Sequence, residues 1–151
     1  MAVSVTGTLD EQRKSVAIEY LKRIDHGGDV FELFAPDAQC YFPKWGIADG
    51  IDEIRQLFSD VMEIIAEIHH DHAYVRFVVS GDTVVAETAS HGTTTSGRTW
   101  RAGVTHAGRG CSVYEIRDGL IQRLFIYLDP DYGDEDLARY PWLQRARASA
   151  A

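Results

Sequence analysis

Cysteine and clustered positive charge are both scarce in this 151-residue sequence. Its two cysteines, Cys40 and Cys111, lie in no C-x-x-C or Cys/His metal-site spacing, which favours free thiols in a reducing cytoplasm, where we expect the protein. The sequence has 15 Lys and Arg against 23 Asp and Glu, a net charge of −8, and no basic cluster. The composition therefore argues against nucleic acid and against an anionic membrane surface as partners.

Long apolar runs, repeats and low-complexity linkers are missing as well. No apolar stretch approaches the roughly 20 residues that span a bilayer, and none near the N-terminus has the character of a signal peptide. The length suits one domain, which we expect to cover residues 1–151, with a frayed tail over 145–151.

The first half of the sequence predicts three helices. A capping box at Thr8 begins the first helix, which ends at Gly27. Asp29 is placed to cap a short second helix. Apolar residues at helical spacing predict a third helix from Ile51 to near Ala66.

The second half predicts strands. Residues 74–79 and 83–89 flank a hairpin turn, and residues 110–116 and 120–128 flank another, after a short strand at 38–43 and a loop at 93–97. Helices followed by an antiparallel meander indicate an α+β fold. The aromatic segment 129–143 is expected to fold back over an apolar opening.

Four stretches carry a resemblance to a known superfamily: "EYLKRIDHGGDVFELFAPDAQCYFP", "GIDEIRQLF", "SGDTVVAETASHG" and "VYEIRDGLIQRLFIYLDPD". Together they span roughly residues 10–130 and resemble the nuclear transport factor 2-like superfamily, above all its SnoaL-like polyketide cyclases, ketosteroid isomerases and scytalone dehydratase. The resemblance implies a cone-shaped, curved, mixed or antiparallel sheet that encloses a pocket with three N-terminal helices. It also implies a homodimer, and chemistry without a cofactor or metal.

The hairpin register decides which side chains reach that pocket. A turn centred on Gly81 and Asp82 pairs Arg76 with Glu87, an opposite-charge pair that favours this register. The resemblance places Glu87 inside the cone, and alternation along the strands then puts a polar set on the same face. This expected set is His70, His72, Tyr74, Arg76, Glu87 and His91.

The residues that alternate with Glu87 along its strand would then point outward, and they are small enough to pack against a partner sheet. These are Val84, Ala86, Thr88 and Ser90. The resemblance further places inward-facing residues on the last two strands. The remaining candidate substrate contacts are Phe42, Trp45, Ser112, Tyr114, Leu124, Ile126 and Leu128.

Four residues are candidates for catalysis. His70 matches by spacing an acid–base histidine of scytalone dehydratase, and Glu87 stands where that enzyme has a second catalytic histidine. His91 is suited to move a proton near pH 7, because imidazole has an unperturbed pKa of about 6.5. Tyr20 matches the tyrosine that polarises the substrate carbonyl in ketosteroid isomerases. Each also has a structural interpretation, as a hydrogen-bonded histidine, an ion pair with Arg76 or a core aromatic.

Departures from the family pattern limit the resemblance. Phe42 stands where ketosteroid isomerases have their base, and Ser112 stands where they have a partner acid, so the same mechanism with the same base is not expected. Asp25 lies near a substrate-contacting aspartate of scytalone dehydratase, although an aspartate at a helix end is often simply solvated. A zinc site made by His70, His72 and His91 with Glu87 is a weaker alternative.

The sequence thus leads to a cofactor-independent acid–base enzyme, a lyase, isomerase or cyclase, that acts on a hydrophobic carbonyl or polyketide-like compound. His70 or Glu87 would remove a proton next to the carbonyl, while Tyr20 or Tyr74 would stabilise the enolate oxygen. A non-catalytic small-molecule binder and a dimerisation module of the same fold stay open as alternatives.

Overall fold

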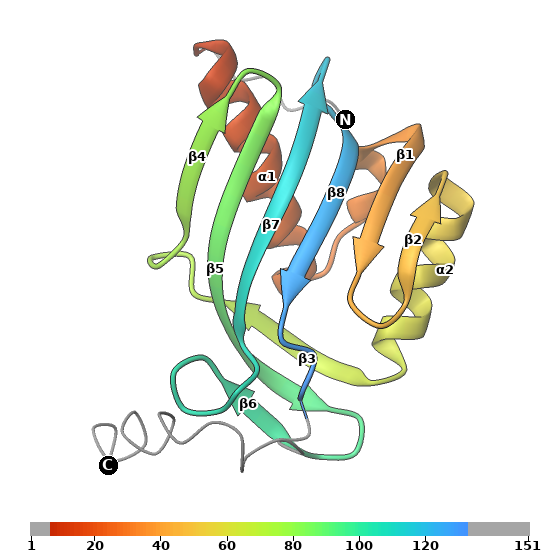
Figure 1. The fold of residues 1–151 in the computed structure, drawn as a ribbon, viewed down its shortest axis with the longest axis vertical. Helices are drawn as coiled ribbons and strands as arrows, with labels where there is room; N and C mark the ends of the chain where they lie inside the picture. The colour runs from red at the N-terminus through yellow and green to blue at the C-terminus, as the bar shows by residue number, and fades with distance from the viewer. Residues whose placement is uncertain (1–6, 133–151) are drawn as a thin grey trace.

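The computed structural model describes residues 7–132, in which a curved sheet packs against two α-helices (Figure 1). Helix α1 (Leu9–His26) begins as predicted, with the Thr8 hydroxyl accepting a hydrogen bond from the Glu11 N–H at 3.4 Å. Helix α2 (Ile51–Met62) buries Ile54, Leu57 and Val61 on one face. Neither helix in this part of the chain is long and apolar enough to cross a bilayer.

The prediction of three helices was wrong. The segment after Asp29 forms only a 3-10 turn, η1 (Val30–Leu33), because the chain enters the sheet at Phe34. Helix α2 also ends at Met62 rather than near Ala66, since Ile65 already belongs to a strand. A bulge between Ile65 and Glu67 allows Ile65 and Ile68 to face the same side, and this three-residue spacing imitates a helix.

The described residues form eight strands in one sheet. Its path runs β2-β1-β8-β7-β5-β3, with β4 and β6 also paired to β5, and only the β1–β8 pair is parallel. The strands are β1 (Phe34–Phe42), β2 (Gly46–Asp49), β3 (Ile65–His70), β4 (Arg76–Ser80), β5 (Thr83–Thr94), β6 (Thr99–Arg101), β7 (Arg109–Arg117) and β8 (Leu120–Leu128). The pairing of Arg76 with Glu87 is confirmed.

Strand β5 gives the sheet its curvature. The first half of β5 pairs with β4 and β7, whereas its second half pairs with β3 and β6. The sheet therefore turns a corner along one 12-residue strand, and β3 crosses below the helices in Figure 1. This corner brings the end of β3 close to the end of α1.

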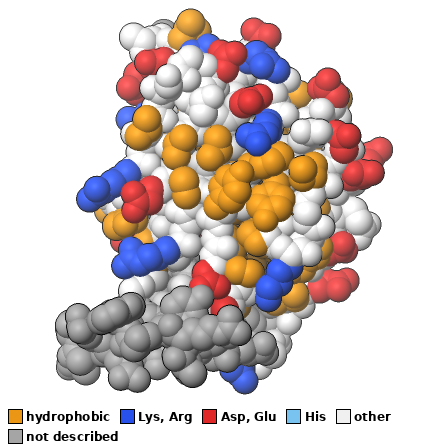
Figure 2. Space-filling view, viewed as in Figure 1, with side chains coloured by type: hydrophobic (Ala, Val, Ile, Leu, Met, Phe, Trp, Pro, Cys, Tyr) orange, Lys and Arg blue, Asp and Glu red, His pale blue; other side chains and the backbone are white. Residues whose placement is uncertain are grey.

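Across the middle of the strands, both the inner and the outer face of the sheet carry apolar side chains. A row of register partners on the inner face packs under the helices: Ala48, Cys40, Leu124, Tyr114, Val84 and Val79. The neighbouring row lies on the outer face: Ile47, Tyr41, Phe125, Val113, Val85 and Val78. We call this second row the outer apolar row, and the outer face in Figure 2 carries a hydrophobic patch across its middle.

Candidate active site

A cavity lies between the inner face of the sheet and the two helices. Its wall is mostly apolar, and about 100 Å³ of its interior admits the centre of a water-sized sphere. This is room for a ring-sized compound, since each water needs only about 10–15 Å³ on the same measure. The lining residues are Tyr20, Leu21, Ile24, Phe42, Leu57, Phe58, Val61, Met62, Ile65, Ile68, His70, Thr88, Ser90, Gly108, Arg109, Gly110, Ser112, Ile126, Leu128 and Tyr132.

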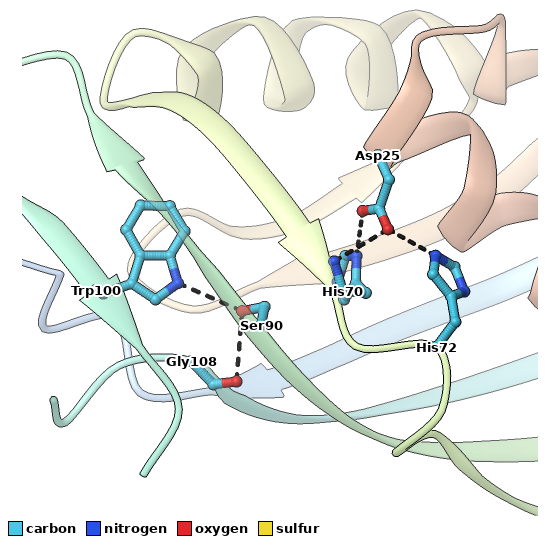
Figure 3. Close-up of polar contacts among 6 residues, drawn as sticks. All are labelled: Asp25, His70, His72, Ser90, Trp100 and Gly108. Carbon is cyan, nitrogen blue, oxygen red and sulfur yellow. Dashed lines mark hydrogen bonds and ion pairs between the residues drawn. The ribbon is translucent and has the colours of Figure 1, made fainter. Parts of the chain in front are cut away.

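A carboxylate with two histidines stands beside this cavity (Figure 3). Asp25 Oδ1 is 2.6 Å from His70 Nδ1, and Asp25 Oδ2 accepts from the His70 backbone N–H at 3.0 Å. The second oxygen, Oδ2, is also 2.7 Å from His72 Nε2. Asp25 comes from the last turn of α1, whereas His70 ends β3 and His72 follows it, so the corner in the sheet creates the cluster.

The Asp25 carboxylate is kept ionised although its side chain is only 2% exposed. Burial by itself raises the pKa of this carboxyl group. The hydrogen bonds from the His70 ring and backbone, the charge of His70 and the hydrogen bond from His72 outweigh burial, so the net pKa is lowered. The C-terminal end of a helix disfavours a negative charge, which makes these donors necessary.

This arrangement fixes the protonation pattern of His70. An ionised carboxylate only accepts hydrogen bonds, so His70 Nδ1 must carry a proton toward Asp25. The other ring nitrogen, Nε2, then holds a lone pair when the ring is neutral, and no described residue hydrogen bonds it. Because His70 lines the cavity and its side chain is 12% exposed, it is oriented as a proton acceptor for a bound molecule.

Hydroxyl groups stand elsewhere in the cavity wall. Tyr20 packs edge-on against Tyr114 with 5.8 Å between ring centroids, and it lines the cavity. Burial raises the pKa of Tyr20 well above its ordinary range, with smaller contributions from Tyr114 and Cys40. The Tyr20 phenol therefore stays protonated and is able to donate a hydrogen bond. Ser112 adds a second hydroxyl to the wall.

Ser90 lines the cavity from β5, and its side chain contacts Trp100 and Gly108 (Figure 3). Its hydroxyl donates to the Gly108 carbonyl at 3.3 Å and accepts from Trp100 Nε1 at 3.4 Å. Gly108 has φ of +107°, and a Cβ there would lie 2.6 Å from the Ser90 carbonyl oxygen. This hydroxyl is therefore committed to joining β5, β6 and the start of β7, which makes its role structural.

The segment after β8 closes one side of the cavity. Tyr132 lines it and packs against Trp100, with 4.7 Å between ring centroids. Asp131 Oδ2 is 3.3 Å from Nδ1 of the buried His106. The rest of the predicted aromatic segment, residues 133–143, lies outside the described residues.

The predicted inward position of Glu87 was wrong. Glu87 is exposed on the outer face, where it accepts a hydrogen bond from the Tyr74 hydroxyl at 2.9 Å, and Arg76 is exposed beside it. The register was right but the face was reversed, because an opposite-charge pair fixes which residues are opposite and not which side is buried. Val84, Ala86, Thr88 and Ser90, expected outside, face inward instead.

The other candidates divide between cavity wall, core and surface. His70, Tyr20, Phe42, Ser112, Ile126 and Leu128 line the cavity. Tyr114 and Leu124 are fully buried in the core, and Trp45 borders a separate hollow beside α2. Half-buried His91 faces His69, and His72 reaches solvent, so neither is in the wall and the zinc grouping with Glu87 does not form.

Asp25 is the residue of this cluster that sequence reasoning undervalued. The signal was present, since an aspartate at the end of the first helix and an H-x-H pair occur in the same chain. Their meeting depends on the bend in β5, which no local pattern reveals. Thr88, Ser90 and Tyr132 were likewise not named as lining residues.

Comparison with protein families agrees with this architecture. A profile of the SnoaL-like domain matches residues 23–124, which is more than half of the chain. The chain belongs to the SnoaL-like family. The comparison of this SnoaL-like protein with curated proteins found no match.

Solved structures share the fold at low sequence identity. A candidate SnoaL-like polyketide cyclase from Jannaschia sp. CCS1 is 16% identical over 83% of this chain and 91% of its own, with a TM-score of 0.68. A candidate polyketide cyclase from Xanthomonas campestris pv. campestris is 14% identical over 92% and 99%, with a TM-score of 0.69. TerC, crystallised with polyporic acid, is 15% identical over 88% and 98%, with a TM-score of 0.66. These TM-scores show that the SnoaL-like protein has the nuclear transport factor 2-like fold.

Proposed function

We propose that this SnoaL-like protein is a cofactor-independent acid–base enzyme that acts on a small hydrophobic compound carrying a carbonyl group. One observation carries the proposal: His70 lines an apolar cavity while its Nδ1 is 2.6 Å from a buried, ionised Asp25. An imidazole held this way has a fixed tautomer, with its second ring nitrogen left to accept a proton, as a general base requires. The co-crystallised ligand of TerC and the naming of two neighbours as candidate polyketide cyclases support the substrate class.

The proposed step is proton removal next to the carbonyl. His70 Nε2 takes the proton, and the electron pair of the broken C–H bond forms the enolate C=C while negative charge moves to the oxygen. Tyr20, whose phenol stays protonated, donates a hydrogen bond to that oxygen. In an isomerisation, the proton on Nε2 then returns to another carbon. In a cyclisation, the enolate carbon forms a C–C bond to a second carbonyl carbon of the same molecule, and the oxygen of that carbonyl takes the proton. In a dehydration, the proton leaves with a hydroxyl group as water.

Exchange of hydrogen for deuterium tests this step without knowledge of the natural substrate. One- and two-ring cyclic ketones are incubated with the protein in D₂O, and the loss of the C–H signal next to the carbonyl is followed by NMR. We expect catalysed exchange, and we expect His70→Gln to slow it about 10²–10⁴-fold. The matched control is His91→Gln, because His91 lies outside the cavity wall. Binding of a ketone without exchange would instead identify a small-molecule carrier.

We also propose that a second copy of this chain covers the outer apolar row. Val78 and Ile47, at the two ends of the row, are 65% and 57% exposed, and Tyr127 beside it is 48% exposed. The row crosses six strands without a polar residue, which is unusual for a face left in water. A two-fold axis through its centre would pair the row with itself.

Light scattering measures this association directly. Ile47→Glu places a charge in the row and is expected to convert a dimer into a monomer. Leu9→Glu is the matched control, since Leu9 is 64% exposed at the start of α1, away from the sheet. A monomeric wild-type protein would contradict the proposal.

A further inference from the structure

His72 is the solvent-facing member of the Asp25 cluster. Its side chain is 38% exposed, compared with 12% for His70 and 2% for Asp25. The three groups therefore form a chain from the cavity to the solvent: His70, then the buried carboxylate, then His72. His72 lies outside the cavity wall, and the proposed reaction assigns it no task.

The geometry of His72 ties its charge to His70. Its Nε2 is 2.7 Å from Asp25 Oδ2, so this nitrogen carries a proton toward the ionised carboxylate. The other ring nitrogen, Nδ1, is then the position where His72 gains or loses its charge. When His72 is cationic, it shares the carboxylate that would otherwise compensate a cationic His70.

The other titratable groups around His72 are few among the described residues. His26, the last residue of α1, stacks on its ring with 6.4 Å between centroids and 17° between planes. Asp71 precedes it in the turn, where Asp71 Oδ1 accepts the Ala73 N–H at 3.1 Å. Among the described residues, neither of these side chains hydrogen bonds to Asp25, whereas His72 does, so His72 links the Asp25–His70 pair to the solvent.

We propose that His72 is a positioning residue that sets how strongly His70 holds a proton, by changing the net charge that Asp25 presents to it. A protonated His72 weakens His70 as a base, and a neutral His72 restores it. The coupling of the two histidines is a property of the folded chain, and its effect on turnover rests on the proposed function.

NMR titration of the protein with ¹³C-labelled histidine Cε1 measures the coupling without a substrate. The variant His72→Asn keeps a donor for Asp25 but removes the charge. We expect the midpoint of the His70 titration to move up by about half a pH unit to one unit, as for two charges that share one carboxylate at a partly solvated site. The variant His72→Phe, which removes donor and charge, should move the midpoint in the same direction.

A matched control separates this coupling from a general effect of losing a histidine. His69→Asn makes the same change on the same strand, next to His70, but the His69 ring faces His91 and not Asp25. The His70 midpoint should stay at its wild-type position in this control. An unchanged midpoint in both His72 variants, with the wild-type amide spectrum retained, overturns the proposal.

Turnover separates this inference from the proposed function. If His70 is the base, the acidic limb of the kcat/KM profile for deuterium exchange moves up in His72→Asn by the same amount as the NMR midpoint. A shifted midpoint with an unshifted pH profile confirms the coupling and removes His70 as the base. An unshifted midpoint with active wild-type enzyme removes His72 and leaves His70 in place.

Discussion

The molecule contains two aspartate–histidine pairs that are built in opposite ways. In Asp25–His70 the carboxylate is 2% exposed and the imidazole reaches the cavity, with 2.6 Å between Oδ1 and Nδ1. In Asp131–His106 the imidazole side chain is fully buried, the carboxylate is 14% exposed, and the distance is 3.3 Å. The first pair leaves a ring nitrogen available to a bound molecule, whereas the second joins the β6–β7 connection to the segment after β8. The two pairs thus differ in which partner is buried, and on this difference we base the proposal that the first pair is catalytic and the second structural.

The largest expected contrast between the pairs is catalytic. His70→Gln should lower kcat/KM for deuterium exchange about 10²–10⁴-fold, because it removes the proposed proton acceptor. His106→Gln should lower the rate far less, because His106 does not line the cavity and affects it only through the segment that carries Tyr132. Rates measured side by side on the same ketone check this, and equal losses in the two variants would remove the distinction.

Gly92 offers a way to disturb both pairs at once. It lies in β5 between Ile68 of β3 and Trp100 of β6, and a Cβ there would be 2.1 Å from the Glu67 carbonyl oxygen and 2.4 Å from the Trp100 ring. Gly92→Ala should therefore lower the free energy of unfolding by about 3 kcal/mol, since backbone has to shift. Urea denaturation gives the value, and a loss below half of it would show that β3 and β6 separate easily.

Asp25→Asn tests the ionised state of the first pair. Because the pKa of Asp25 is lowered in the folded protein, its charge stabilises the fold above the ordinary pKa of 3.8, and that contribution is lost as pH falls through the lowered value. At pH 7 the variant should be less stable by about 1–3 kcal/mol. Urea denaturation at pH 7, 5, 4 and 3 should show this difference shrink only below pH 3.8.

His106→Gln tests the second pair through stability. Replacing a fully buried, hydrogen-bonded imidazole should lower the free energy of unfolding by about 1–2 kcal/mol. Fluorescence of Trp100, which packs against Tyr132, should change with it as the segment after β8 loosens. Unchanged stability and fluorescence would mean that the pair is not a tether.

The smallest effect is expected at Glu87. Glu87→Gln removes an exposed charge on the outer face, where Tyr74 donates to the carboxylate. We expect a change in stability below about 0.5 kcal/mol and no change in exchange rate. A large loss of rate would return Glu87 to the site and contradict the face assignment.

Local signals in the sequence were sufficient for much of the fold. Residues 120–128 were predicted as a strand with the bounds of β8, and Thr8 was predicted as the N-cap of α1, because alternation and capping are properties of neighbouring residues. Strand β3 was missed because its bulge gives Ile65 and Ile68 a helical spacing. Strand β6 has three residues and was too short to show any period.

The site was harder to predict because it depends on which face of β5 is buried. Val84 and Val85 are adjacent and both apolar, so the alternation of apolar and polar residues did not show which side of β5 faces inward here. The face of β7 was predicted correctly through Ser112, and the pairing of Ser112 with Ala86 would have corrected β5. That pairing joins strands separated by a long connection, which no sequence pattern fixes.

The central position of β5 predicts an uneven pattern of amide hydrogen exchange. Amides of residues 83–87 lie between β4 and β7, and those of 91–93 lie between β3 and β6, so they should exchange only when the whole chain unfolds. His70 is the register partner of Ser90 on this strand, and its own backbone N–H donates to Asp25 Oδ2 at the end of α1. The proposed base is thereby held between the central strand and the last turn of α1, so we expect the movement that admits a ligand in α2 or in the segment that carries Tyr132.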